Sequence, residues 1–347
     1  MTGHVYVDDN TAGVNTIGAF DRHADGTLTP EPGFPFAAGG AGLASQGALQ
    51  VSPDGRFLIA ADAGSNQVSV LRIVRDGSLR LVRGGVVSSG GVLPVSVAVH
   101  GDLVYVANAD HGGSNYTGFC LRRDGRLDPV PGSTVALPDG AQPGDVLFNG
   151  TGTRLAGTRV GTSLIDSFTV GSGGRLKAAP GSPFPAQGLG PFGSEFRSTQ
   201  PGQLFVSNAH NAGAGSGTVS AFTDAADGRL TSIGSSPFAD LQTAPCWVEI
   251  TRDGRYLFTV NTASGSISRY RIASDGVLAL LGSTPVRTAG AGAVDARLSP
   301  DGRTLYLDEA KAGAVGGFAV HGGDLTELPG SPAPLPAGAA PAGIVVT

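Results

Sequence analysis

The hydrophobic residues of this chain fall in short runs, and tight polar turns separate one run from the next. Residues 51–73 (VSPDGRFLIAADAGSNQVSVLRI) are the clearest example: an apolar run, an Asp-Gly turn, a second run, a polar turn and a third run. Alternating and β-branched residues with Asp-Gly punctuation are typical of antiparallel strands joined by tight turns. No segment predicts a convincing helix. The pattern therefore predicts an all-β protein.

The same arrangement recurs along the whole chain, and small glycine turns mark its period. Each turn precedes a leucine-rich strand, and the turns end at Gly26, Gly77, Gly125, Gly174, Gly228, Gly276 and Gly323. Their spacing is roughly 50 residues, and that period with four short strands per unit is typical of a β-propeller blade. The sequence therefore predicts a seven-bladed β-propeller, with four antiparallel strands per blade, as a single domain over residues 1–347.

The two ends of the chain fit the same scheme. The chain begins in the second strand of a blade (4–9) and ends in an inner strand (342–347). We expect the last strand to complete the first blade, which closes the ring and removes an exposed sheet edge. The predicted blades are 342–347 with 1–41, 42–90, 91–138, 139–188, 189–240, 241–290 and 291–341. A ring without a free edge also predicts a monomer.

Composition and charge narrow the classes of function. Hydrophobic residues make up 40% of the chain and charged residues 15%, and the net charge is −5. The chain therefore lacks the excess of positive charge that is typical of proteins that bind nucleic acid or an anionic membrane. No secretory signal and no apolar run of ~18 residues is visible, so we expect a cytoplasmic protein with a small-molecule ligand. Cys120 and Cys246 stand far apart in the repeats, and we predict no disulfide.

The predicted topology divides the turns between the two faces of the disc. Turns between second and third strands share one face with the connections between blades. This face surrounds the mouth of the central channel, where propellers usually bind small ligands. Of the 6 histidines, only His111 and His210 lie in these segments. Each is either an ordinary exposed loop histidine or a functional group.

The ends of the second strands form a ring of polar residues, one from each blade. Its members are Asp9, Asp62, Asn108, Arg159, Asn208, Asn261 and Glu309. Asp and Asn at a strand end are explained by hydrogen bonds to the following turn. Arg159 and Glu309 are not turn formers, so a functional role for them stays open beside a structural one.

The inner strands form a second ring beside the channel. Two residues after the start of each strand stand Ala48, Ser96, Asp145, Gly193, Trp247, Asp295 and Gly343. Small residues are expected where seven strands converge, so the carboxylates Asp145 and Asp295 depart from the pattern. They should repel each other unless a cation, a proton or an arginine separates them, and Arg159 and Arg297 are the candidate arginines. Trp247 is either packing between blades or a wall that stacks against a ligand.

No motif for a cofactor or for a transition metal is present, so the sequence predicts neither. The Gly-rich runs lack the strand-to-helix setting of a phosphate cradle. The one metal alternative is a hard divalent ion held by Asp145, Asp295 and Glu309.

The repeat residues carry a family resemblance. The segments SPDGRFLIAADAGSNQVSVLRI (52–73) and DGRYLFTVNTASGSISRYRIASDG (253–276), with PGSPF-type loops, resemble the lactonase-type seven-bladed propellers. That family includes bacterial 6-phosphogluconolactonase and the fungal 3-carboxy-cis,cis-muconate lactonising enzyme, and the resemblance covers the whole chain. It implies the propeller fold and chemistry that opens or closes a ring.

The chain departs from this family at its characteristic histidines. Members of the family are similar in an H-P-H pattern at the start of one blade and a G-P-R-H pattern in a later one. Here the first is Gln142-Pro143-Gly144 and the second is Gly190-Pro191-Phe192-Gly193. The chain therefore resembles a diverged branch.

Three classes of function remain. The first is a lactonase, cycloisomerase or cyclase with its site at the channel mouth, and specialised metabolism is one setting for it. In it Arg159 would bind or polarise an oxyanion, and a general acid or base would come from His210, Glu195 or Glu309. The predicted substrate contacts are Trp247, Asp145, Asp295, His111, Phe192 and Arg297. The second class is a non-catalytic binder of small molecules or peptides, and the third is a platform for protein partners. A cavity shared by Arg159, Glu309 and Asp295 would favour the enzyme.

Overall fold

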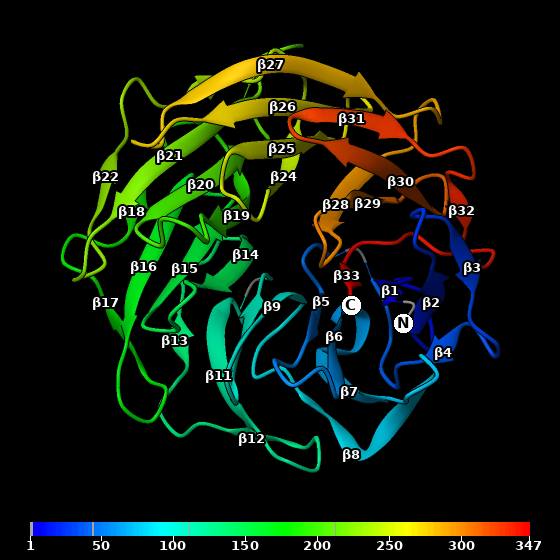
Figure 1. The fold of residues 1–347 in the computed structure, drawn as a ribbon. Coiled ribbons are helices and arrows are strands. Elements are labelled where there is room, and N and C mark those ends of the chain that lie inside the picture. Colours follow the sequence, from blue (N-terminus) through cyan, green and yellow to red (C-terminus); the bar gives the residue numbers. More distant parts are fainter. Residues whose placement is uncertain (1–2, 44, 111, 212) are drawn as a thin grey trace.

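The computed structural model describes residues 3–43, 45–110, 112–211 and 213–347, and it confirms the predicted propeller (Figure 1). Seven antiparallel sheets follow one another around a central channel in chain order. The single helical element among the described residues is a 3-10 turn, η1 (Ala63–Ser65). In that part of the chain, nothing has the length and apolar composition of a membrane-spanning helix.

The first three blades contain the following strands. The first blade consists of β1 (Gly3–Asp8), β2 (Thr16–Arg22), β3 (Leu28–Pro30), β4 (Phe36–Ala37) and β33 (Ile344–Val346). The second blade consists of β5 (Leu49–Val51), β6 (Phe57–Asp62), β7 (Gln67–Ile73) and β8 (Leu79–Ser88). The third blade consists of β9 (Pro94–His100), β10 (Leu103–Asn108), β11 (Asn115–Leu121), β12 (Leu127–Pro129) and β13 (Val135–Ala136).

The other four blades repeat this order. The fourth blade consists of β14 (Pro143–Phe148), β15 (Arg154–Arg159), β16 (Leu164–Val170), β17 (Leu176–Ala178) and β18 (Phe184–Pro185). The fifth blade consists of β19 (Pro191–Phe196), β20 (Gln203–Asn208), β21 (Thr218–Asp224), β22 (Leu230–Ser232) and β23 (Phe238–Ala239). The sixth blade consists of β24 (Pro245–Ile250), β25 (Tyr256–Asn261), β26 (Ser266–Ile272) and β27 (Leu278–Pro285). The seventh blade consists of β28 (Ala293–Leu298), β29 (Thr304–Glu309), β30 (Ala314–His321), β31 (Asp324–Glu327) and β32 (Ala333–Pro334).

The outermost strand differs from the simple four-strand prediction in five blades. There it is divided into two short segments that both pair with the third strand, as β12 and β13 both pair with β11. A proline stands in each interruption, and proline has no N–H for the ladder. These prolines are Pro35, Pro131, Pro183, Pro237 and Pro332. The corresponding stretches of β8 and β27 have no proline, and both strands run on with one irregularity.

The ring closes as the sequence predicts. The C-terminal strand β33 pairs antiparallel with β1, with Val346 opposite Val5 and Ile344 opposite Val7. Both ends of the chain therefore belong to the first blade, and the C-terminal strand is the inner strand of that sheet (Figure 1).

The hydrophobic core lies between neighbouring blades, and buried tyrosines bridge them. Phe57 of the second blade belongs to the same buried cluster as Phe119 of the third. The hydroxyl of Tyr105 in β10 donates to the Gly174 carbonyl of the next blade at 2.7 Å, and Tyr6 donates to Gly77 at 2.9 Å. The glycine turns that mark the period thus accept hydrogen bonds across the blade boundaries.

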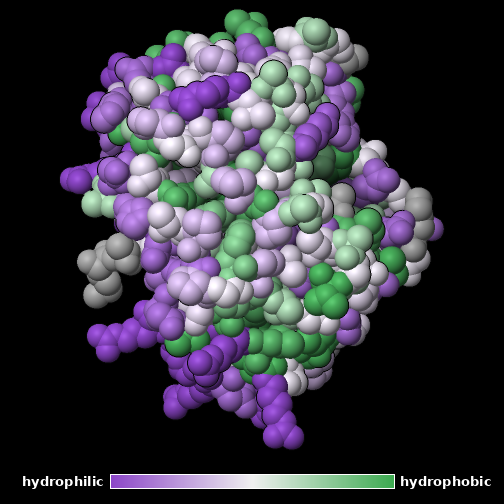
Figure 2. Space-filling model, turned by 90° about the vertical axis from the view of Figure 1, so that its right-hand side faces the viewer, coloured by the Kyte–Doolittle hydropathy of each residue, from purple (hydrophilic) through white to green (hydrophobic). Residues whose placement is uncertain are grey.

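Six large hydrophobic side chains are exposed among the described residues. They are Val14, Leu43, Leu81, Leu189, Leu241 and Leu281. They come from separate parts of the chain. On the side of the molecule drawn in Figure 2, hydrophobic residues gather in the lower middle of the view, and strongly hydrophilic residues lie mainly at the left and bottom margins.

Candidate functional site

A cavity of about 390 Å³ opens at one mouth of the channel, over the second to fifth blades. Its lining residues are Ser45, Gln46, Leu93, Val95, Ala109, Asp110, Gln142, Pro143, Gly144, Val160, Phe192 and His210. All belong to connections between blades, to the first residues of inner strands or to turns after second strands. This is the face that the sequence predicts for a ligand, and the volume is that of a small-molecule pocket.

His210 and Phe192 form an aromatic pair on the cavity wall, as members of the fifth blade. Their ring centroids lie 6.0 Å apart in an edge-on arrangement. The turn after β20 brings His210 over the start of β19, where its N–H donates to the Leu189 carbonyl at 3.0 Å. Gly190 makes this approach feasible, because a Cβ there would lie 2.5 Å from Cγ of His210. The imidazole is exposed and can meet a ligand.

Asp110 occupies the position in the third blade that His210 occupies in the fifth. Each stands two residues after the polar ring, and the Asp110 N–H donates to the Val92 carbonyl as that of His210 does to Leu189. The fourth blade has Gly161 at this position. Alignment of the repeats could have identified Asp110, which the sequence prediction missed. The predicted site residue His111 lies outside the described residues.

Gln46 forms the floor of the cavity. Its Nε2 donates to the carbonyls of Cys246 at 3.2 Å and Val294 at 3.0 Å, so the side chain reaches from the second blade to the sixth and seventh. The next residue, Gly47, lies against Trp247, because a Cβ there would be 2.9 Å from the indole. Gln46 and the buried Trp247 therefore close the channel beneath the cavity, and Trp247 does not line the cavity.

Asp145 and Asp295 lie beneath this floor, and neither lines the cavity. Asp145 accepts hydrogen bonds from the Ser96 hydroxyl at 2.9 Å and from the Ser194 hydroxyl at 2.7 Å. Burial raises the pKa of Asp145, and it raises the pKa of Asp295 to about 7 although Arg297 opposes the shift. From the sequence, a cation, a proton or an arginine could relieve the repulsion between these two carboxylates. With a pKa of about 7, Asp295 can hold a proton near neutral pH, and this proton would relieve the repulsion.

Glu195 and Arg297 meet deeper in the channel, together with a residue that the sequence prediction missed, Glu249. Arg297 Nη1 lies 2.9 Å from Glu249 Oε1, and Glu195 accepts a hydrogen bond from the Ile250 N–H at 2.6 Å. Burial and the neighbouring Glu249 raise the pKa of Glu195 well above its usual range, although Arg297 opposes the shift. The three inner strands of the fifth, sixth and seventh blades carry these residues at equivalent positions: Glu195, Glu249 and Arg297. An alignment of the repeats could therefore have shown that the three charged side chains lie close together. None of them lines the cavity.

Arg159 does not reach the cavity, and it pairs with neither of its predicted partners. Its guanidinium donates to both oxygens of Asp166, each at 2.6 Å, and the side chains are 11% and 3% exposed. In the fifth blade the equivalent positions are Asn208 and Ser220, which also bond to each other, at 2.9 Å. The same two positions on the second and third strands are thus bonded to each other in both blades. The Arg159–Asp166 ion pair takes the place of the Asn–Ser hydrogen bond in the fourth blade.

Glu309 is also remote from the cavity. Its side chain is fully buried, and burial raises its pKa. The structure thus does not bring Arg159, Glu309 and Asp295 into one cavity, which was the condition that favoured catalysis at those residues. The three predicted ligands of a hard divalent ion, Asp145, Asp295 and Glu309, do not form a cluster either. Among the described residues, the one metal-type cluster consists of His4, Asp21 and Glu31.

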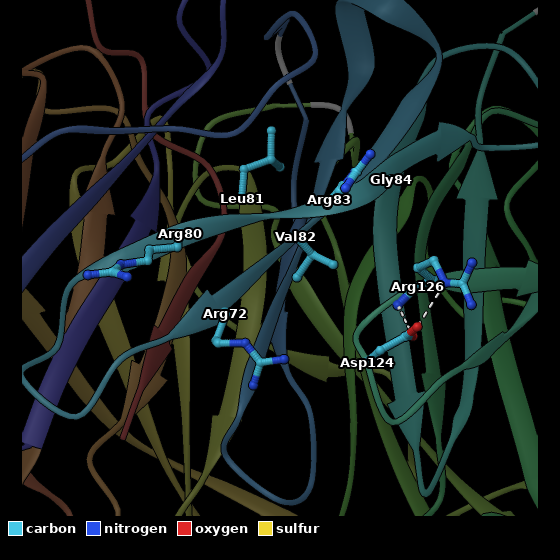
Figure 3. Close-up of a pocket in the computed structure, with 8 residues that line it drawn as sticks. All are labelled: Arg72, Arg80, Leu81, Val82, Arg83, Gly84, Asp124 and Arg126. Atoms are coloured by element: carbon cyan, nitrogen blue, oxygen red, sulfur yellow. Dashed lines mark hydrogen bonds and ion pairs between the residues drawn. The ribbon is translucent and has the colours of Figure 1, made fainter.

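A larger groove, of about 920 Å³, lies on the outer side of the second and third blades. It is lined by Arg72, Arg80, Leu81, Val82, Arg83, Gly84, Asp124 and Arg126. Figure 3 shows that the arginines point in different directions and that Asp124 already pairs with Arg126, at 2.9 Å. This open surface does not converge on a ligand, so the channel mouth is the better candidate.

The fold and the cavity define a seven-bladed propeller with a small-molecule pocket at one mouth of its channel. A family model described as "Lactonase, 7-bladed beta-propeller" matches residues 14–130 and 195–345, and the chain belongs to this family. The unmatched residues 131–194 contain both Gln142-Pro143-Gly144 and Gly190-Pro191-Phe192-Gly193, the two segments at which the chain departs from the patterns that the resemblance implies. A search of curated proteins finds no match.

Solved structures of similar fold include two that carry gluconolactonase names. The periplasmic gluconolactonase of Pseudomonas aeruginosa has a TM-score of 0.80 at 16% identity, over 100% of this chain and 99% of that one. A Bacteroides uniformis protein assigned as a 6-phosphogluconolactonase has a TM-score of 0.77 at 20% identity, over 100% and 99% of the two chains. At these identities the likeness shows the fold alone.

Proposed function

We propose that this protein is a hydrolase of neutral lactones that acts in the cavity at the channel mouth. The observation that carries the proposal is the exposed His210, held edge-on to Phe192 in a pocket that also contains Asp110 and the amides of Gln46 and Gln142. Apolar walls with a few convergent polar groups are typical of sites that bind and orient a small substrate.

Each of these groups has a task in the hydrolysis of a lactone. Imidazole in its neutral form can take a proton from a water molecule as that water attacks the lactone carbonyl carbon. The ring C–O bond then breaks, and the imidazolium returns the proton to the leaving oxygen. The Gln142 amide can donate to the carbonyl oxygen, on which negative charge develops. The Oε1 of Gln46 remains available to accept from a substrate hydroxyl, because its Nε2 is used beneath the cavity.

The charge of the cavity selects the class of lactone. Among the described lining residues there is no arginine and no lysine, and Asp110 is the one residue with a formal charge at neutral pH. A phosphate or carboxylate on the substrate would be desolvated there without a counter-charge, which is unfavourable. The proposed substrate is therefore an uncharged lactone, in contrast to the phosphorylated substrate that the name of the Bacteroides uniformis protein states.

The test is a turnover assay with uncharged γ- and δ-lactones and with 6-phosphogluconolactone. We expect hydrolysis of an uncharged lactone and a loss of about 100-fold or more in kcat for His210→Gln. His321→Gln, at an exposed histidine on another part of the surface, is the matched control and should leave the rate unchanged. Preference for the phosphorylated lactone, or full activity of His210→Gln, would contradict the proposal.

A non-catalytic binder is the second candidate. The observation that favours it is the replacement of both family histidine patterns, at Gln142-Pro143-Gly144 and at Gly190-Pro191-Phe192-Gly193. In that case uncharged lactones would raise the thermal unfolding midpoint by binding to the folded state, without turnover. Ring closure instead of ring opening, in a cyclase or cycloisomerase, would use the same histidine and would be recognised by its product.

A further inference from the structure

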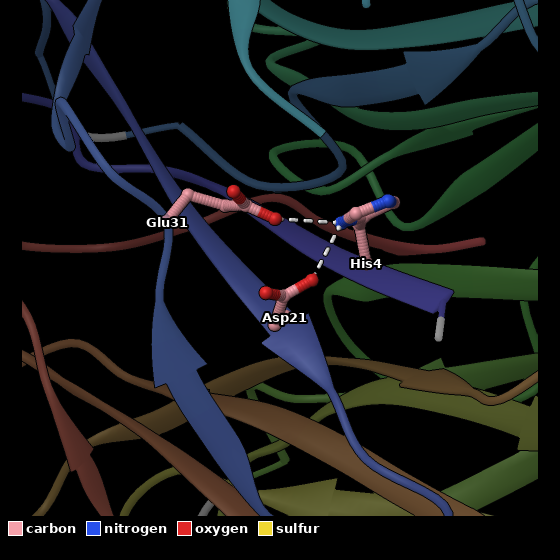
Figure 4. A group of neighbouring side chains, drawn as sticks. All are labelled: His4, Asp21 and Glu31. Carbon is pink, nitrogen blue, oxygen red and sulfur yellow. Dashed lines mark hydrogen bonds and ion pairs between the residues drawn. The ribbon is translucent and has the colours of Figure 1, made fainter. Parts of the chain in front are cut away.

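Three potential metal ligands meet at the edge of the first blade, on separate strands and remote from the channel cavity (Figure 4). His4 lies in β1, Asp21 in β2, and Glu31 directly follows β3. The Nδ1 of His4 is 2.8 Å from Glu31 Oε1 and 3.5 Å from Asp21 Oδ1. The Glu31 side chain is 3% exposed, that of His4 16% and that of Asp21 36%.

The sevenfold repeat shows that this combination is a departure from the fold's own pattern. His4 and Asp21 pair across β1 and β2. The equivalent pairs in the other blades are Phe57–Arg72, Leu103–Cys120, Arg154–Thr169, Gln203–Thr223, Tyr256–Arg271 and Thr304–Ala319. At the Glu31 position the other blades carry Val82, Val130, Ala179, Ile233, Leu281 and Leu328. The other six blades thus carry an apolar residue there, and among the described residues only the first blade has three ligating side chains together.

The departure is costly unless a cation compensates it. A buried carboxylate is unfavourable without a partner, and the Glu31 side chain is 3% exposed. Among the described residues, His4 supplies the one basic side chain paired with Glu31 and Asp21. A divalent cation between the three side chains would compensate the two carboxylates.

We propose that His4 Nδ1, Glu31 Oε1 and Asp21 Oδ1 bind a divalent transition-metal ion of the Zn²⁺ class. Ligand atoms about 2.0–2.2 Å from a zinc ion lie about 3–3.5 Å from one another, and His4 Nδ1 lies 2.8 and 3.5 Å from the two carboxylate oxygens. An imidazole beside two carboxylates suits Zn²⁺, and it favours Zn²⁺ over Mn²⁺, while Mg²⁺ and Ca²⁺ prefer all-oxygen sites. The exposed side of Asp21 is the path by which the ion and its remaining solvent ligands arrive.

The second blade covers the site. Gly77 stands against the ligands, because a Cβ there would lie 2.3 Å from Glu31 Oε1 and 2.4 Å from His4 Nδ1. The Tyr6 hydroxyl holds this turn through the Gly77 carbonyl, at 2.9 Å. The metal would therefore stabilise the first blade, which both chain ends share, at its joint with the second.

The test is calorimetric titration of the chelator-treated protein with ZnCl₂, with CoCl₂ absorption in the visible range as a second readout. We expect one ion per chain, a rise in the thermal unfolding midpoint, weaker binding of MnCl₂ and no binding of MgCl₂. Glu31→Gln and Asp21→Asn should each weaken Zn²⁺ binding by about tenfold or more. His321→Gln, which removes an exposed histidine, should bind like the wild type.

Three results would overturn the proposal: no Zn²⁺ binding by the wild type, a loss of binding in His321→Gln, or wild-type affinity in Asp21→Asn. The Asp21 variant decides the matter if Glu31→Gln fails to fold, because Asp21 is partly exposed and its replacement by Asn keeps the shape. Lactone turnover provides an independent readout, since the cavity at the channel mouth contains none of these residues.

Discussion

The Arg159–Asp166 pair makes the sharpest prediction about stability, because the sequence alone left a functional role for the arginine open beside a structural one. The structure shows two 2.6 Å contacts and a further hydrogen bond from the Tyr116 hydroxyl to Asp166 at 3.1 Å. The variant Arg159→Asn would leave the carboxylate of Asp166 buried, with the tyrosine as its remaining partner in this group. The expected result is a large loss of stability without a direct effect on ligand binding.

The magnitude follows from the burial of the pair. Removing one partner of a buried ion pair costs about 3–5 kcal/mol, and both side chains are well covered, at 11% and 3% exposure. Unfolding entropy of ~2.1 cal/mol/K per residue gives about 0.7 kcal/mol/K for a chain of 347 residues. The thermal unfolding midpoint should therefore fall by about 4–7 °C, a shift that scanning calorimetry measures easily.

The propeller itself supplies the matched control. The double variant Arg159→Asn with Asp166→Ser recreates the Asn208–Ser220 pair of the fifth blade, so most of the lost stability should return. Two results would refute the reasoning. One is a single variant as stable as the wild type, and the other is a stable double variant that has lost lactone turnover, which would give Arg159 the catalytic role.

Three further predictions concern the channel. Gln46→Ala removes both cross-channel hydrogen bonds. The free energy of unfolding should fall by about 1–3 kcal/mol, which corresponds to a drop of about 1–4 °C in the unfolding midpoint. An unchanged midpoint would mean that Gln46 does not hold the blades together. Ala109→Phe adds bulk to the cavity wall, so KM for an uncharged lactone should rise about tenfold or more with little change in stability, and an unchanged KM would place the substrate elsewhere. The folded-state pKa of Asp295 is raised to about 7, above ~3.9 in the unfolded chain. The folded state therefore binds more protons between these values, and this group lowers stability as pH rises from about 4 to 7. The unfolding midpoint of Asp295→Asn should accordingly fall less than that of the wild type between pH 5 and 8, and parallel curves would contradict the assigned pKa.

The fold was predictable from sequence because its signals are local and repeated. Asp-Gly turns, alternating strands and the period of the glycine turns each require only short windows, and the closure of β33 on β1 follows from counting strands. The interruption of the outer strands was also readable, since a proline stands at each one. The sequence could not show how far side chains reach across the channel. Gln46 stands where five other blades have a proline, and nothing in that pattern indicates that its amide contacts two blades on the far side.

Site residues were predicted with less success, because position in a ring does not fix the direction of a side chain. His210 and Phe192 line the cavity, whereas Arg159 turns sideways to Asp166 and Trp247 lies under the floor. A residue that departs from the repeat is therefore not evidence of function by itself. Arg159 departs from the Asn of its neighbours, but Asp166 compensates it within the same blade.

The distinction that matters is whether the rest of the chain compensates a departure. The left-handed backbone of Leu93 and Gln142 beside the cavity resembles functional strain. Ala244, which does not line the cavity, has the same conformation before Pro245, so this conformation belongs to the fold. His210 is exposed to the cavity and held by its backbone and by packing, and Glu31 is a buried carboxylate that shares one histidine with Asp21. At such positions a side chain can donate, accept or coordinate beyond what the neighbouring residues require. We therefore expect the substrate at His210 and the metal ion at Glu31.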